Sequence, residues 1–172
     1  KLLVGSSGRR LDLPGALTFA VEYHRCTLGR LDSNVLLPPE ETDLPVPGVV
    51  QFGPWMINAR VVGPTPNLEN NHSPCNALMD AKAIGDRLTI RLRRPGDRFH
   101  PLGLQKEKSL QDFLIDRKIP KRERDAIPLL VGKGHIAWIV GYRVAAWAMP
   151  SSKSSRLVAI EFRMSSASGT MG

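Results

Sequence analysis

Short runs of alternating polar and apolar residues, separated by proline and glycine, limit the folds that are open to this chain. Between residues 11 and 31, apolar side chains occupy every second position after a Pro14-Gly15 turn, a pattern typical of a β-hairpin. Residues 51–62 predict two more short strands around a Gly-Pro pair. We therefore expect residues 1–65 to form a β-rich subdomain.

The second part of the chain predicts a mixture of strands and short helices. Residues 87–93 alternate, which indicates a half-buried strand with Arg91 and its basic neighbours on the exposed face. Ser109 is a good N-cap for a helix that runs to about Arg117, and Pro120 suits the first turn of a second short helix. Apolar runs bounded by turn residues predict further strands, at 129–131, 136–140 and 156–163.

The segment at 63–76 has three prolines and four asparagines and little apolar content, which favours a linker. The expected fold class is α+β, with a β-rich part followed by a small mixed α/β domain of strands and two short helices. The expected boundaries are a β-rich subdomain at 1–65, a linker at 66–78, the mixed domain at 79–164 and a disordered tail at 165–172.

Positive charge is concentrated in the second half of the chain. The formal net charge is +8, and residues 87–124 contain 12 Lys or Arg against 5 Asp or Glu, a net of +7. Such asymmetry indicates contact with a polyanion such as nucleic acid. A well-solvated surface explains a charge run equally well, so charge alone leaves both alternatives open.

The block LRRPGDRFHPLG at 92–103 is the most distinctive segment. Its turn places Arg93, Arg94 and Arg98 near one another, and guanidinium groups bind phosphate in a bidentate manner. Asp97 is expected to pair with one arginine and to order the turn while the other arginines face outward.

More basic residues follow the turn and flank the two predicted helices. The remaining candidate phosphate contacts are Lys106, Lys108, Lys118, Lys121, Arg122, Arg124 and Arg143. For each of these alone, solvation is the simpler interpretation. Trp138 lies in an apolar run and is expected in the core, whereas Tyr142 and Trp147 are left open for stacking on unpaired bases.

Common catalytic signatures are missing from the 172 residues. There is no Walker loop, GxGxxG, GxSxG, CxxC or HExxH, and the four histidines are scattered, so no catalytic residue, metal site or cofactor is predicted. The longest apolar stretch, 136–149, is too short and too charged to cross a bilayer. With two cysteines, no expected secretory signal and no predicted membrane contact, we expect a cytoplasmic protein with reduced thiols.

Three motifs in order resemble one known family. LRRPGDRFHPLG, then SLQDFLIDRKIPKRERDAIPLL, then IAWIVGYRV are similar to the C-terminal domain of bacterial tRNA(Ile)-lysidine synthases, over about residues 79–163. That family has an RRPGDRF turn, a KDFFID-type helix, a VPRxxRDxxPLL stretch and a WVxGxR strand. SGRRLDLPGAL and LPVPG resemble, more weakly, the segments that link its catalytic and C-terminal domains.

The resemblance implies an ATP-dependent ligase that attaches lysine to the wobble cytidine of the isoleucine tRNA with a CAU anticodon. In the family, a PP-loop domain with an SGGxDS loop binds ATP and lysine, with Mg²⁺ expected there, and this loop is absent from the 172 residues. The chain is therefore expected to be an inactive fragment that contacts tRNA and the catalytic domain, with no cofactor of its own. The implied fold is similar to a module of the phenylalanyl-tRNA synthetase β subunit.

The sequence departs from the family pattern in two places. Gln105 and Glu107 replace small residues before the first helix, and VAAWAM at 144–149 replaces a stretch that often reads Ile-Asp-Glu-Arg. A second hypothesis is that the basic face is a protein-interaction or dimerisation module that docks on the catalytic domain without touching RNA. A homodimer is compatible with either hypothesis.

Overall fold

Antiparallel strands dominate this computed structural model, which describes residues 9–13, 17–22, 25–30, 39–63, 74–101 and 106–164. The chain divides into two compact units, 1–36 and 37–172. In the first unit, β1 (Arg9–Leu13), β2 (Leu17–Glu22) and β3 (Arg25–Arg30) form one antiparallel sheet in that order. The predicted hairpin is confirmed and gains a third strand; its Pro14-Gly15 turn lies outside the described residues.

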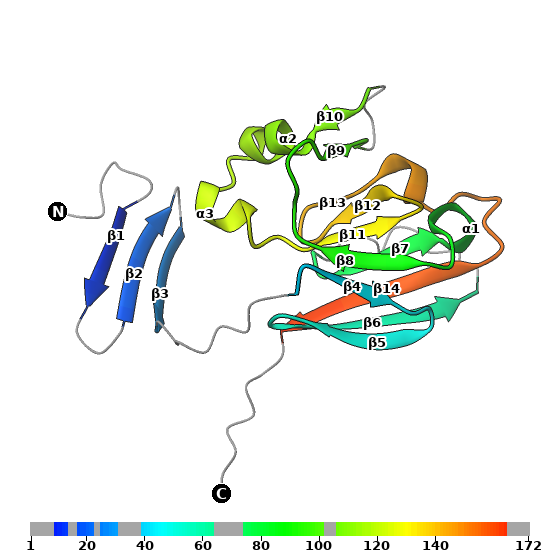
Figure 1. Ribbon diagram of the computed structural model, residues 1–172, viewed down its shortest axis with the longest axis horizontal. Helices are drawn as coiled ribbons and strands as arrows, with labels where there is room; N and C mark the ends of the chain where they lie inside the picture. The colour runs from blue at the N-terminus through cyan, green and yellow to red at the C-terminus, as the bar shows by residue number, and fades with distance from the viewer. Residues whose placement is uncertain are drawn as a thin grey trace, which may run out of the picture. The chain divides into compact units, whose positions relative to one another are not determined.

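The second unit contains two larger antiparallel sheets (Figure 1). The five-stranded sheet has the order β13-β12-β11-β8-β4, and the four-stranded sheet has the order β5-β6-β14-β7. The strands of the first are β4 (Glu41–Leu44), β8 (Leu88–Arg91), β11 (Leu129–Gly132), β12 (His135–Ile139) and β13 (Arg143–Val144). Those of the second are β5 (Gly48–Phe52), β6 (Trp55–Val62), β7 (Asn76–Asp80) and β14 (Leu157–Met164).

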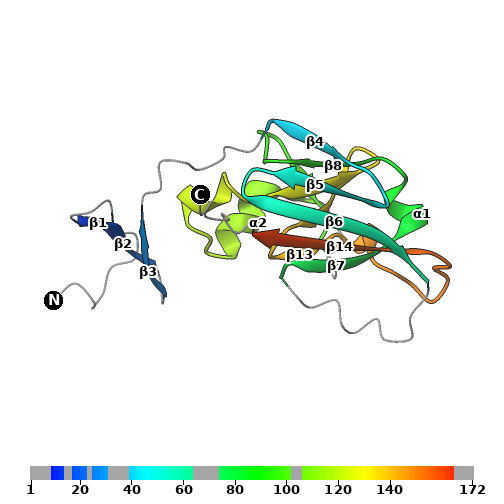
Figure 2. The ribbon, with the colours of Figure 1, turned by 90° about the horizontal axis from the view of Figure 1, so that it is seen from below.

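Buried residues of both sheets form one hydrophobic core. Figure 2 shows the strands of these two sheets from below. Phe162 of β14 meets Trp138 of β12 edge-on, with ring centroids 5.3 Å apart, and meets Trp55 of β6 at 6.1 Å. Phe162 and Trp138 are both 2% exposed. The expectation that Trp138 belongs to the core is confirmed, and this aromatic contact joins one sheet to the other.

Short helices and a small strand pair complete the second unit. α2 (Leu110–Asp116) follows β10 (Lys108–Ser109), which pairs with β9 (Arg98–Phe99). The Ser109 hydroxyl accepts from the Asp112 amide at 3.4 Å, so the predicted N-cap is confirmed. α3 (Lys121–Arg124) begins after Pro120 as predicted, and α1 (Ala81–Ile84) was not predicted. No described helix has the length and apolar character needed to span a membrane.

The expected domain boundary at 66–78 differs from the structure. β6 pairs along its whole length with β14, and β4 pairs with β8, so residues 41–62 belong to the same sheets as the second half of the chain. The division at 36/37 replaces the predicted one. The proline-rich segment connects β6 to β7, which lie on either side of β14 in one sheet, because local composition does not report which distant strands pair.

Candidate nucleic-acid interface

The turn between β8 and β9 is held from beneath by Asp97. Its carboxylate accepts two hydrogen bonds from the Arg91 guanidinium, at 2.9 and 2.8 Å, and a third from the Arg94 amide at 2.7 Å. Burial opposes ionisation of Asp97, yet these donors hold the pKa of its carboxyl below the ordinary value. The prediction that Asp97 orders the turn is confirmed.

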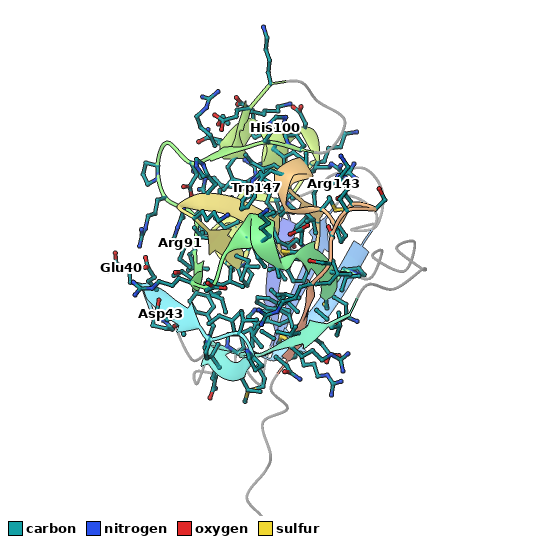
Figure 3. All side chains as sticks on the ribbon, turned by 90° about the vertical axis from the view of Figure 1, so that its right-hand side faces the viewer. Glu40, Asp43, Arg91, His100, Arg143 and Trp147 are labelled. Atoms are coloured by element: carbon teal, nitrogen blue, oxygen red, sulfur yellow. The ribbon has the colours of Figure 1, made fainter. Side chains whose placement is uncertain are left out.

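The partner of Asp97 is not one of the predicted arginines. Arg91 ends β8, and its side chain is only 10% exposed (labelled in Figure 3), although the alternation of 87–93 places it on an exposed face. The Asp97 carbonyl also accepts from the Leu110 amide at 2.9 Å, which ties the turn to the start of α2. Buried Arg91 therefore supports the turn from within the fold. The sequence feature that could have indicated this role is Asp97, an acidic residue six positions later.

The three arginines of the turn are accessible, but each has an acidic partner. Arg93 contacts Asp125 at 2.5 Å, Arg94 contacts Glu41 at 2.9 Å and Arg98 contacts Glu107 at 3.2 Å. The side chains of Arg94 and Arg98 are 46% and 58% exposed, and that of Arg93 is 27% exposed. The expectation that these arginines simply face outward is therefore incomplete.

Two of these ion pairs connect the turn to other elements of the fold. Asp125 follows α3 and Glu41 begins β4, and Glu40 adds a weaker contact to Arg94 at 3.6 Å. Exposed ion pairs of this kind contribute little stability, and their charges remain available to other partners. The structure thus places the three arginines around one turn, where an incoming phosphate would compete with carboxylates.

The remaining candidates are divided between exposed and structural positions. Lys106, Lys118 and Lys121 are exposed, and Lys108 pairs with Asp116 of α2. Arg124 has a structural contact, since its Nε donates to the Ile119 carbonyl at 2.7 Å. Arg122 is exposed and also has an interaction partner.

Arg143 is separated from the arginine turn. It lies on β13, at one edge of the five-stranded sheet, whereas β8 and β4 form the other end, and Figure 3 shows Arg143 apart from Arg91 and Glu40. Within the described part of the chain, its Nε is the one buried side-chain polar atom that lacks a hydrogen-bond partner. The structure does not bring Arg143 into the cluster predicted from the sequence.

A pocket of about 220 Å³ lies beside the turn and was not predicted as a unit. Arg98 and Glu107 contribute to it, together with His100, His135 and Trp147. The two histidines lie far apart in the sequence, since His100 follows β9 and His135 begins β12. Only the fold reveals that they share a pocket. The sequence left open whether Trp147 stacks on a base, and the structure places it half-buried in this pocket.

Comparison with known proteins shows which family the chain resembles. Residues 88–160 match the model of the TilS substrate C-terminal domain. The tRNA(Ile)-lysidine synthase of Dehalococcoides mccartyi is 35% identical over 161 residues, and that of Caldanaerobacter subterraneus is 30% identical over 162 residues. These matches cover 92% and 94% of this chain but 34% of each relative, so the chain spans about a third of their length.

A solved structure supports the same assignment at the level of the fold. The crystal structure of a TilS C-terminal domain superposes with a TM-score of 0.63 at 24% identity, covering 74% of this chain and 99% of that one. The sheet-rich architecture with few helices is that of this domain, while the likeness to a phenylalanyl-tRNA synthetase module stays a prediction. Residues 88–160 thus match the TilS substrate C-terminal domain, and most of the chain is similar to about a third of the length of tRNA(Ile)-lysidine synthases.

Proposed function

We propose that this chain is the tRNA-binding part of a tRNA(Ile)-lysidine synthase. The observation that carries the proposal is the turn at 94–98, which a buried Arg91–Asp97 pair holds in place while Arg93, Arg94 and Arg98 remain accessible around it. Preorganised guanidinium groups are suited to phosphate oxygens, and A-form RNA is recognised mainly through its backbone and shape.

The acidic partners of these arginines reduce the affinity of the proposed interface for any single phosphate group. A phosphate must replace Asp125, Glu41 or Glu107, so an isolated phosphate gains little from the exchange. A tRNA that engages several arginines and the exposed lysines together gains enough to displace the carboxylates. This arrangement favours an RNA of the right shape over any single phosphate group.

In the proposed reaction, the whole enzyme uses ATP to activate the wobble cytidine of the CAU-anticodon isoleucine tRNA and attaches lysine to it. The 172 residues lack the SGGxDS loop, so we propose that ATP, lysine and Mg²⁺ are bound by a separate catalytic domain and that this chain alone does not catalyse the reaction. Its contribution is to hold the tRNA body so that the anticodon reaches that domain. The proposed location is the cytoplasm, where tRNA is modified.

The first expected result concerns the salt dependence of binding. The chain should bind the isoleucine CAU tRNA with a log–log salt slope of roughly −4, which corresponds to about five phosphate contacts. The measurement is a fluorescence anisotropy titration over a salt series, with the elongator methionine tRNA and a random RNA duplex as comparisons. A preference for the isoleucine tRNA would assign discrimination to this chain. Absence of binding to all three at low salt would contradict the proposal and favour a protein-docking module.

The second expected result concerns Arg93 and Arg94. The double variant R93A/R94A should bind tRNA about tenfold more weakly and lower the salt slope by about 2, because two phosphate contacts are lost. The matched control is R60A/R163A, which removes two exposed arginines from β6 and β14. Equal losses in both variants would show that only net charge matters, and an unchanged R93A/R94A would exclude the turn from the interface.

A further inference from the structure

We propose that the pocket beside the arginine turn receives one unpaired nucleotide of the bound RNA. This inference rests on the proposed function, because it assigns a specific subsite to the same RNA ligand. The pocket has a volume of about 220 Å³, below the usual range of drug-sized ligand sites, which is roughly 300–1,000 Å³. A cavity of this size is suited to a single planar base rather than to a folded partner.

The floor and wall of the pocket provide the contacts that a base requires. Phe99 and Ile136 are buried, at 1% and 4% exposed, and line its inner surface. His135 and Trp147 form one wall, with their rings edge to face at 73° and their centroids 6.3 Å apart. His135 is exposed and Trp147 is half-buried, so both rings can be reached from solvent. Aromatic rings stack on any base, because every base has a π-face.

The mouth of the pocket provides the polar contacts. Arg98 and Glu107 lie there, about half-exposed and 3.2 Å apart. The Arg98 guanidinium is placed for the phosphate of a nucleotide, and the Glu107 carboxylate can accept a hydrogen bond from an exocyclic amino group of the base. Because Arg98 also belongs to the arginine turn, a strand held by the turn can deliver a nucleotide directly to this pocket.

Backbone hydrogen bonds form the pocket before any ligand arrives. The Ala146 amide donates to the His100 carbonyl at 3.1 Å, and Pro101 and Ala145 form a bridge. These contacts fix the 3-10 turn Ala146–Ala148, which carries Trp147, against the segment that follows β9. Preorganised aromatic side chains lose little entropy on binding, so stacking here can add measurably to affinity. Trp147 also lies in the stretch 144–149, where this chain departs from the family pattern.

The test compares two RNA hairpins that differ only in a single-stranded 3′ extension of about three nucleotides. For the 172-residue chain, the extension should tighten binding about tenfold, a gain typical of one stacked base. W147A should abolish the gain and leave binding of the blunt hairpin unchanged, and W147F should retain most of it. H135A, at an exposed position, should reduce the gain without a risk to folding. Y142A is the matched control, since Tyr142 is an exposed aromatic residue outside the pocket.

The outcomes separate this inference from the proposed function. No gain from the extension, or a gain that survives in both W147A and H135A, overturns the pocket assignment while blunt-hairpin binding still supports the RNA interface. If neither hairpin binds, the proposed function fails, and quenching of Trp147 fluorescence by AMP or CMP then decides the pocket. Quenching that is present in the unmodified chain and lost in W147F supports a nucleotide site, and its absence overturns it.

Discussion

Replacing Phe162 with alanine is expected to lower the free energy of unfolding by about 4 kcal/mol. Phe162 is 2% exposed. Its ring contacts Trp55 in its own four-stranded sheet and Trp138 in the five-stranded sheet. Truncation would remove buried aromatic surface and leave a cavity between two sheets that cannot collapse onto it. Urea unfolding followed by tryptophan fluorescence measures the change, since two of the three tryptophans report on this cluster.

The matched control for this substitution lies two residues further along β14. Met164 is 63% exposed, and M164A should change the free energy of unfolding by less than about 0.5 kcal/mol. F162L, which fills much of the space, should cost about half as much as F162A. A loss below about 1 kcal/mol for F162A would contradict the view that this cluster joins the two sheets.

Removal of the Asp97 carboxylate is expected to cost about 3 kcal/mol of stability. D97A leaves the Arg91 guanidinium, 10% exposed, without its ionic partner, and an uncompensated buried charge is strongly destabilising. The same variant should weaken RNA binding, because Asp97 also accepts from the Arg94 amide and so shapes the turn. Thermal unfolding and the hairpin titration measure the two effects separately.

Two variants test the reason for that loss. D125N breaks the exposed pair with Arg93, in which the Asp125 side chain is 63% exposed, and should change stability by less than about 1 kcal/mol. R91M/D97L removes both charges of the buried pair and should recover much of the stability lost in D97A. If D125N and D97A were equally destabilised, burial of the Arg91–Asp97 pair would not be the cause.

The stability that Asp97 contributes is expected to fall at acidic pH. The pKa of Asp97 is lowered on folding from its ordinary value of 3.8, so its contribution is fully present above that value. The contribution is lost as the pH falls below about 3.8 through the lowered native pKa. Between pH 5 and pH 2, D97N should therefore lose less stability than the unmodified chain.

Local features of the fold could be predicted where a pattern depends on neighbouring residues. Alternation located the strands, and Ser109 located the start of α2, because both signals act within one element. The boundary at 66–78 was wrong because composition describes a connection, whereas the pairing of β6 with β14 depends on residues about a hundred positions apart. Pairing over such distances is not encoded in any short window.

The candidate site shows the same division between local and distant information. The motif RRPGDRF located the turn, but alternation alone placed Arg91 on an exposed face, because periodicity does not reveal that Asp97 folds back beneath β8. Glu41 and Asp125 could not be identified as partners of the arginines, since each belongs to a different element. His100 and His135 became neighbours only through the fold.

The position of β14 has a consequence for synthesis on the ribosome. β6 and β7 do not pair with each other; both pair with β14, the last described strand in the chain. Until residues 157–164 emerge, the edges of β6 and β7 that pair with β14 have no partner strand. The apolar faces of these strands then remain open to solvent and to other nascent chains. Completion of this sheet therefore waits for the synthesis of β14, and a message truncated before β14 yields an aggregation-prone chain rather than a smaller folded domain.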